Sequence, residues 1–144
     1  SGALSLESLS RGCQSALCIE KSPRHAEFIR RNAEAAGYGA AVFRVRVQDV
    51  FPALQHIASD GEQFDLILAD PPYGEKNVGR RSNSLAQKLV DDRHLPAVLA
   101  PGGLLILGHA RRDMLEIPPP WEELKVLAHG DNVMRFLRLR PEPA

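Results

Sequence analysis

Short apolar runs alternate with segments of helical periodicity along most of the chain, and this alternation limits the possible folds more than any other feature. Runs typical of strands occupy residues 15–20, 41–47, 64–69 and 104–108, and the run at 64–69 is expected to be the clearest buried strand. Segments typical of helices occupy residues 4–9, 24–36, 51–59 and 82–99. Such alternation predicts an α/β fold with a mostly parallel sheet and helices on both of its faces.

Local signals mark where some of these elements begin and end. Ser22 followed by Pro23 predicts a helix start, because serine caps a first turn and proline fits the first helical position. The helical segment at 82–99 is expected to break near Pro96. The Pro-Gly-Gly sequence at 101–103 predicts a turn into the next strand.

A hairpin completes the predicted order of elements. Residues 124–128 and 133–139 have strand character, and the Gly-Asp-Asn sequence at 130–132 lies between them. A glycine-containing turn between two such runs is typical of an antiparallel hairpin. We therefore predict a mostly parallel sheet that ends in a C-terminal antiparallel hairpin.

The composition is that of one globular domain without net charge. The 144 residues include 18 Lys and Arg against 18 Asp and Glu, and 44% of the residues are hydrophobic. Zero net charge excludes a histone-like tail or a polybasic membrane anchor, so any contact with nucleic acid must come from a local basic patch. No apolar run is long enough to cross a bilayer and the N-terminus lacks the features of a secretory signal, so we expect a cytoplasmic protein without a membrane partner.

Cysteine and histidine are too sparse to indicate a metal site. Cys13 and Cys18 cannot form a disulfide framework or a four-ligand zinc site, and we expect both to be reduced thiols. The five histidines show no spacing typical of zinc ligands. We predict no bound metal.

The sequence Asp70-Pro71-Pro72-Tyr73 follows directly on a predicted strand and carries the most chemical information. Two consecutive prolines fix two φ angles and remove two N–H donors, so this loop offers acceptors, the Asp70 carboxylate and the Pro71 carbonyl. A stiff pair of acceptors suits the two hydrogens of a planar –NH2 group, and Tyr73 can stack on the ring that carries this group. The alternative is that the prolines only end a strand and that Tyr73 is a surface aromatic.

Two further acids follow predicted strands, where ligands bind in parallel sheets. Glu20 can accept hydrogen bonds from both hydroxyls of a ribose, and the alternative is a solvated acid at a strand end. Asp49 can accept from an adenine amine, supported by the backbone at Val50 and Phe51. Asp49 can also cap the helix that begins at Val50, and the two roles are compatible.

Together these residues resemble a bacterial family that methylates N2 of a guanine in 16S ribosomal RNA. The resemblance covers nearly the whole chain, and its most family-specific part is the segment at 1–12, Ser-Gly-Ala-Leu followed by Glu7, Ser10, Arg11 and Gly12. The other matching positions are Glu20, Asn32, Asp49, Asp70-Pro71-Pro72-Tyr73 and the closing hairpin at 130–139. The Asp-Pro-Pro-Tyr motif alone is shared by many amino-methyltransferases that act on DNA, RNA or protein.

The resemblance implies a Rossmann-like class I methyltransferase fold with S-adenosylmethionine as the methyl donor. The residues that it assigns to the donor are Gly2 in the donor-binding loop, Glu20 at the ribose, Asp49 and Val50 at the adenine, and Asp70. The residues that it assigns to catalysis at the target amine are Asp70, Pro71, Pro72 and Tyr73.

Two departures from the family accompany this resemblance. The family's opening strand and most of its glycine loop should precede Ser1, and that strand would lie beside the strand that ends at Glu20. We therefore expect the single domain at 1–144 to be incomplete at its N-terminus and to bind the donor poorly by itself. Gly108 ends a predicted strand where we expect the family to place an acid, so a supporting contact is expected to be missing there.

A glycine-punctuated segment with three cations, Lys76, Arg80 and Arg81, follows Tyr73. We interpret it as a mobile loop that closes over an unpaired or flipped base and contacts RNA phosphates; the alternative is a solvated basic loop without a partner. Because the chain has no net charge, recognition of ribosomal RNA is predicted to require a small-subunit particle.

Other functions are consistent with the same residues. A DNA adenine or cytosine amino-methyltransferase or a protein-glutamine methyltransferase has the same motif, although 144 residues leave little room for a region that recognises DNA. A non-catalytic RNA-binding or assembly module of the same fold is the third possibility, and the incomplete donor loop favours it.

Overall fold

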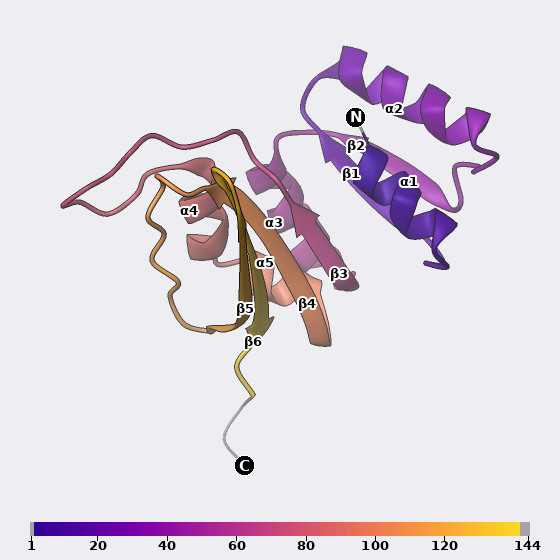
Figure 1. Cartoon of the computed structure of the whole chain (residues 1–144). Coiled ribbons are helices and arrows are strands. Elements are labelled where there is room, and N and C mark those ends of the chain that lie inside the picture. Colours follow the sequence, from indigo (N-terminus) through magenta and orange to yellow (C-terminus); the bar gives the residue numbers. More distant parts are fainter. Residues whose placement is uncertain (1, 142–144) are drawn as a thin grey trace. The chain divides into compact units, whose positions relative to one another are not determined.

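The computed structural model describes residues 2–141, which fall into two compact units (Figure 1). The first unit ends at His56 and the second begins at Ile57. The elements of the first unit are α1 (Ala3–Ser10), β1 (Ala16–Glu20), α2 (Pro23–Ala35) and β2 (Phe43–Val47). Helix α3 (Val50–Asp60) crosses the boundary. The elements of the second unit are β3 (Phe64–Ala69), α4 (Leu85–Asp91), α5 (Leu95–Val98), β4 (Leu99–Ala110), β5 (Trp121–His129) and β6 (Asn132–Leu139).

The first unit is a parallel strand pair packed against two helices. Strands β1 and β2 pair in parallel, with Glu20 opposite Val47 at their carboxyl ends. One apolar cluster joins the helices to the strands, and its buried members are Leu9, Ile29, Ala33 and Phe43. This packing fixes the carboxyl ends of β1 and β2 next to each other.

Helix α2 begins where the sequence predicts. The Ser22 hydroxyl accepts a hydrogen bond from the His25 backbone N–H at 3.3 Å, and Pro23 occupies the first turn. Apolar residues at helical spacing, Ala26 and Ile29 among them, are buried, whereas Arg30 is exposed. The cap and the apolar stripe together confirm this helix.

The second unit is a four-stranded sheet in the order β3-β4-β6-β5. Strand β4 pairs in parallel with β3 and antiparallel with β6, and β5 and β6 form the predicted hairpin. Leu105, Leu107 and Leu137 are fully buried in this sheet, and the indole N–H of Trp121 donates to the Val90 carbonyl at 3.1 Å. That bond holds the start of the hairpin against the end of α4.

The prediction that β3 is deeply buried was wrong. Asp65 and Leu66 are exposed, with 39% of Leu66 accessible to solvent. Among the described strands β3 pairs only with β4, so its other edge is open. Strand β1 likewise pairs only with β2, and the sheet therefore occurs as two separately bonded pieces.

The helical segment at 82–99 breaks near Pro96, as predicted. Helix α4 ends at Asp91, and the Asp92 carboxylate accepts from the backbone N–H of His94 at 2.8 Å and of Leu95 at 3.1 Å, where α5 begins. One boundary differs from the prediction. The turn at 101–103 lies inside β4, where the register with β3 shifts and Gly102 has a φ of +76°. Helices in the described part of the chain are all too short or too polar to span a membrane.

His109 is a buried histidine on β4 that the fold keeps neutral. Its Nε2 accepts from Arg135 Nε at 2.8 Å, and its Nδ1 donates to the Ala110 carbonyl at 2.8 Å. Burial, assisted by the neighbouring Arg135 charge, lowers the pKa of His109 below its usual 6.5.

This pKa shift predicts a loss of stability in acid. The unfolded chain binds the proton at a higher pH than the folded chain does, so the contribution of His109 is present above about pH 6.5 and is lost as the pH falls. Between pH 7.5 and 5.5, urea unfolding should show the wild type losing more stability than His109→Gln, by at most about 1.4 kcal/mol. Equal losses in both proteins would contradict a neutral His109.

Candidate active site

The Asp-Pro-Pro-Tyr loop leaves the carboxyl end of β3 in the second unit. Asp70 is exposed, and its carboxylate forms no hydrogen bond or ion pair with any residue from 2 to 141. Tyr73 is half exposed, with 50% of its surface accessible. The carboxylate and the ring are therefore both available to an external group.

Gly108 on β4 provides the space in which the Asp70 carboxylate lies. A Cβ atom added to Gly108 would be 2.7 Å from Asp70 Oδ1 and 3.4 Å from its Cγ. This proximity follows from the strand register, which pairs the preceding residues, Ala69 and Leu107. Strand β4 continues to Ala110, so Gly108 does not end the strand as predicted, and its missing side chain accommodates the carboxylate.

A buried polar cluster supports the other end of the loop. Asp113 is fully buried, and its Oδ1 accepts a short hydrogen bond from the Ser82 hydroxyl. Its Oδ2 has no hydrogen-bond partner among the described residues. A Cβ atom added to Gly74 would lie 2.8 Å from this Oδ2 and 2.5 Å from Ser84 Cβ. The chain after Tyr73 can approach Asp113 this closely only because residue 74 is glycine.

Hydrogen bonds to residues 110–116 anchor the segment that we predicted to be a mobile basic loop. The guanidinium of Arg112 donates to the Gly74 carbonyl at 3.0 Å. The buried Asn77 side chain donates to the Met114 carbonyl at 3.0 Å and accepts from the Met114 N–H at 2.8 Å. These contacts attach Gly74 and Asn77 to the segment that follows β4, whereas Val78, between them and Arg80, is exposed.

The three cations of this segment have different surroundings. Arg81 donates to Asp91 at 2.5 and 2.7 Å and to Glu116 at 2.5 Å. Its hydrogen bonds to Asp91 and then to Glu116 raise the pKa of Arg81 above its usual range, and its guanidinium lowers the pKa of Asp91. Lys76 and Arg80 are exposed and form no ion pair with the described residues. Of the three predicted RNA contacts, Lys76 and Arg80 therefore have a positive charge that no acidic side chain neutralises, whereas Arg81 does not.

In the first unit, Glu20 and Asp49 lie at the same edge of the β1–β2 pair. The Gln48 N–H donates to the Glu20 carbonyl at 3.0 Å, which continues the strand pairing to the residue before Asp49. His25 Nδ1 lies 3.1 Å from a carboxylate oxygen of Glu20, and Lys21 Nζ lies 3.7 Å from Asp49 Oδ2. The structure thus brings two of the predicted donor ligands together.

The structure confirms that Asp49 caps a helix. Its Oδ1 accepts from the Phe51 N–H at 3.1 Å, and its carbonyl accepts from the Ala53 N–H at 3.1 Å. Val50 is the first residue of α3. Capping occupies one carboxylate oxygen, so Oδ2 is the oxygen left for a ligand.

Gly2 has a structural role besides the one that the resemblance assigns to it. It precedes α1 with a φ of +73°, and a Cβ atom added there would lie 2.8 Å from Ile29 Cγ2. Glycine is therefore required by both conformation and packing. Ser1, the other residue at this end of the segment 1–12, lies outside the described residues.

Sequence reasoning missed the groups that support the loop. Asn77, Ser82 and Asp113 are polar residues of irregular segments, and their buried contacts join positions 31 to 37 residues apart. No local periodicity identifies such pairs. Gly108 was noted only as a departure from a pattern, and its approach to Asp70 depends on the strand register.

The comparison with known families identifies the class of this chain. A family described as "Conserved hypothetical protein 95" matches residues 1–138, and the chain belongs to this family. The fold described above agrees with the solved structures that follow.

The chain is similar to a small part of longer curated proteins. It is 26% identical over 105 residues to ribosomal RNA large subunit methyltransferase I of Erwinia tasmaniensis. It is 28% identical over 107 residues to the protein of the same name in Yersinia pseudotuberculosis. Each match covers 73% of this chain and 26% of the relative, so the chain spans about a quarter of these relatives' length.

Solved structures with this fold are described as methyltransferases. The putative methyltransferase yhhF of Escherichia coli has a TM-score of 0.75 and 22% identity, covering 97% of this chain and 72% of that one. SMU.776, a putative methyltransferase complexed with SAH, has a TM-score of 0.71 and 15% identity, covering 94% and 42%. These likenesses confirm the Rossmann-like α/β methyltransferase fold.

The closeness of Gly108 to Asp70 predicts an energetic coupling between the two positions. Gly108→Ala should destabilise the protein by at most about 1 kcal/mol, because the new methyl group meets the end of the exposed Asp70 side chain, which can rotate away. In an Asp70→Ala background the same change should be neutral or stabilising, since alanine suits a strand better than glycine. Urea unfolding of the four proteins measures this coupling.

Gly39→Ala serves as the control, because a Cβ atom there meets nothing within 4 Å. If Gly108→Ala changes the free energy of unfolding equally in the wild-type and Asp70→Ala backgrounds, the contact between residue 108 and the Asp70 carboxylate is contradicted.

Proposed function

We propose that this chain is the catalytic part of an S-adenosylmethionine-dependent methyltransferase that modifies an exocyclic amine of ribosomal RNA. The observation that carries the proposal is the Asp70 carboxylate, which is exposed, lacks a partner among the described residues and begins a loop stiffened by two prolines. The methyltransferase fold and the names of the curated relatives support it.

The loop suits an amine that must become nucleophilic. The lone pair of a base amine is delocalised into the ring, so the nitrogen reacts poorly. Asp70 and the Pro71 carbonyl accept its two hydrogens, which favours a tetrahedral nitrogen and localises the lone pair. S-adenosylmethionine supplies a methyl group on a positively charged sulfur. Tyr73 stacks on the base, a contact worth about 1–3 kcal/mol, and most of the acceleration comes from this positioning.

The edge formed by Glu20 and Asp49 is proposed to hold the donor. The Glu20 carboxylate accepts from the ribose hydroxyls, and the uncapped oxygen of Asp49 accepts from the adenine amine beside Val50. Among the described residues, the side chains in polar contact with these two acceptors are the exposed His25 and Lys21, which a ligand can displace. Gly2 belongs to the donor loop in this assignment.

We further propose that tight donor binding needs a strand and glycine loop that precede residue 2. The open edges of β1 and β3 support this, since each carries backbone groups without a strand partner among the described elements. A domain that is incomplete at its N-terminus would bind the donor weakly until such a strand pairs with it.

The finer proposal concerns the target, which is N2 of an unpaired guanine in 16S rRNA within a small-subunit particle. The residues at 1–12 and the Asp-Pro-Pro-Tyr motif support it through the family resemblance. The curated relatives carry a large-subunit name, which makes a 23S target the second candidate. Lys76 and Arg80 are the proposed contacts to RNA in the loop. Arg81 anchors the end of this loop through its ion pairs with Asp91 and Glu116.

The target can be identified directly. The protein carrying the preceding strand, incubated with labelled S-adenosylmethionine and unmethylated small and large ribosomal subunits, should label 16S rRNA in the small subunit. Digestion should release N2-methylguanosine. Label in 23S rRNA would show that the target lies in the large subunit and would leave the enzyme class unchanged. Label only in DNA or protein would overturn the RNA assignment. A protein that does not bind the donor even when it carries the preceding strand would be a non-catalytic module.

Substitutions at Asp70 and Glu20 should separate methyl transfer from donor binding. Asp70→Ala should abolish methyl transfer and leave the donor dissociation constant nearly unchanged. Glu20→Ala should raise that constant at least tenfold, because a charge-assisted hydrogen bond contributes about 1.5–3 kcal/mol. Calorimetric titration and transfer rates measure the two effects.

Asp65→Ala is the matched control for Asp70, since Asp65 is an exposed acid on β3, the strand that Asp70 follows. Loss of donor affinity in Asp70→Ala, or an unchanged donor constant in Glu20→Ala, would show that the roles are misassigned.

A further inference from the structure

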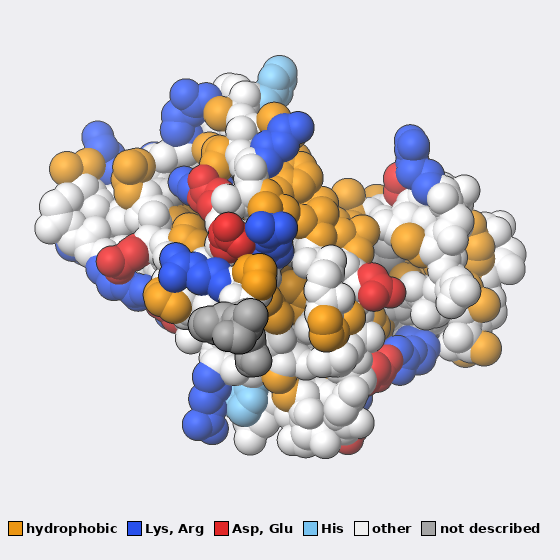
Figure 2. Space-filling view, turned by 90° about the horizontal axis from the view of Figure 1, so that it is seen from below, with side chains coloured by type: hydrophobic (Ala, Val, Ile, Leu, Met, Phe, Trp, Pro, Cys, Tyr) orange, Lys and Arg blue, Asp and Glu red, His pale blue; other side chains and the backbone are white. Residues whose placement is uncertain are grey.

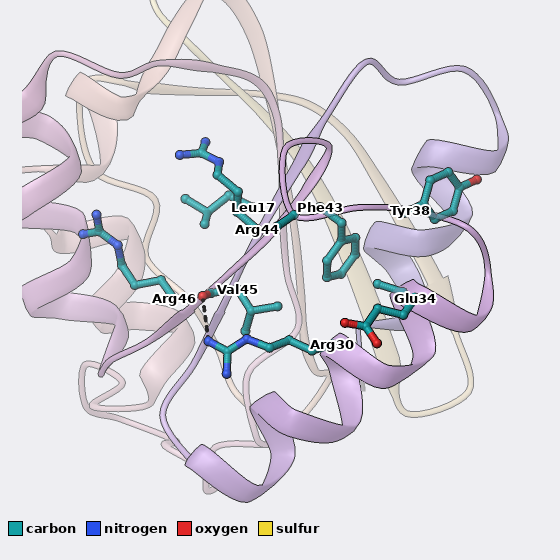
Figure 3. Close-up of a pocket in the computed structure, with 10 residues that line it drawn as sticks. Leu17, Arg30, Glu34, Tyr38, Phe43, Arg44, Val45 and Arg46 are labelled. Atoms are coloured by element: carbon teal, nitrogen blue, oxygen red, sulfur yellow. Dashed lines mark hydrogen bonds between the residues drawn. The ribbon is translucent and has the colours of Figure 1, made fainter.

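The first unit contains a surface pocket of about 490 Å³ whose lining includes neither Glu20 nor Asp49. It is formed by α2, by the loop that follows α2, by β2 and by Leu17 of β1 (Figure 3). The charged residues that line it are three arginines, Arg30, Arg44 and Arg46, and one acid, Glu34. The chain as a whole has no net charge, so this is a local excess of positive charge.

The pocket includes the outer edge of β2. The Ala16 N–H donates to the Val42 carbonyl and the Gln48 N–H donates to the Glu20 carbonyl, which shows that even-numbered residues direct their backbone groups to β1. In a parallel pair the alternate residues direct theirs away from the partner, so Val45 and Val47 present N–H groups outward. The Val45 carbonyl on this edge accepts from Arg30 Nη2 at 3.4 Å.

No acidic side chain among the described residues neutralises Arg30 or Arg46 at this edge. Neither forms an ion pair with any residue in the described part of the chain, where the hydrogen-bond partner of Arg30 is the neutral Val45 carbonyl. Figure 3 shows Arg46 directed to one side of β2 and Arg30 reaching the strand from α2. The two guanidinium groups thus flank an edge that also offers backbone donors.

The alternative partners of an open strand edge are another strand and an anion. Charged side chains along an edge oppose the addition of a strand. Guanidinium groups match phosphate oxygens in geometry and charge, and backbone N–H groups add to such a site. A polymer of phosphodiesters can also follow the edge from Arg30 to Arg46.

We propose that the Arg30–Arg46 edge of β2 binds phosphodiester groups of the RNA substrate outside the loop that holds the target base. This rests on the proposed function for the identity of the RNA. It assigns a role to the edge of β2 that faces away from β1. No sequence motif marks this edge. Sequence reasoning placed the RNA contacts in the loop after Tyr73 instead.

A pair of variants with equal charge change tests the proposal. The test variant is Arg30→Gln/Arg46→Gln. The control is Arg11→Gln/Arg31→Gln, because Arg11 pairs with Glu7 at 2.6 Å and Arg31 with Glu27 at 3.3 Å. The probe is a fluorescein-labelled single-stranded RNA of about 20 nucleotides, followed by anisotropy from 50 to 200 mM KCl. Circular dichroism and thermal unfolding of both variants confirm that each is folded.

The test variant should bind the RNA about tenfold more weakly at 50 mM KCl, and the slope of log K against log salt should fall by about 1.4, the value for two phosphate contacts to a single strand. The control should stay within about twofold of the wild type. Equal losses in both variants, or no loss in the test variant, would overturn the proposal. Competition by poly-L-glutamate as effective as that by unlabelled RNA would also overturn it, since the edge would then recognise acidic polymers in general.

Donor titration keeps this result separate from the proposed function. The test variant should bind S-adenosylmethionine as the wild type does, because neither arginine lies at the donor edge. If neither protein binds the donor but the RNA affinities differ as expected, the phosphate site stands and the enzyme assignment fails. If donor binding and methyl transfer proceed and the RNA affinities do not differ, the enzyme assignment stands and the phosphate site fails.

Discussion

The geometry of the acceptor loop depends on the backbone of Gly108, beside which the Asp70 carboxylate lies. The parallel register of β3 and β4 fixes this position, and any side chain at residue 108 would occupy it. At the far end of the loop, Gly74 allows the chain to lie against buried Asp113. Two prolines span the interval between these contacts. The loop is thus held by steric fit and stiff dihedral angles, which leaves both Asp70 oxygens without an internal hydrogen bond among the described residues.

Ion pairs neutralise some of the charged side chains in this protein and leave others without a partner among the described residues. On the face shown in Figure 2, basic and acidic side chains are interspersed and apolar surface lies between them. Arg81 illustrates the consequence, because Asp91 and Glu116 occupy its guanidinium and make it a clamp within the second unit. Arg30 and Arg46 lack such partners. In a chain with no net charge, the ability to attract an anion belongs to individual arginines and cannot be inferred from their number.

Features encoded by near neighbours were predictable from the sequence, and those created by distant contacts were not. The Ser22 cap, the stripe on α2 and the closing hairpin all follow from residues a few positions apart. The exposure of Leu66 does not follow from near neighbours. An apolar run indicates that a strand favours burial, but burial also requires a neighbouring strand. The roles of Asn77 and Asp113 arise from partners over 30 residues away, and polar residues in irregular segments carry no period from which to infer them. For the same reason the sequence marked Asp70 as an acceptor but could not locate the glycine beside it.

The open edge of β3 connects these observations to the proposed need for a further strand. An apolar strand with one free edge exposes backbone N–H and C=O groups beside residues such as Leu66, an arrangement that favours pairing with another strand. Unlike the outer edge of β2, which Arg30 and Arg46 flank, the residues of β3 include only one charged side chain, Asp65. Charge therefore distinguishes the two edges: that of β2 opposes strand addition and attracts phosphate, while that of β3 is suited to accept a strand. A strand paired there would restrict the residues leading into Asp70, so such pairing would also stiffen the acceptor loop.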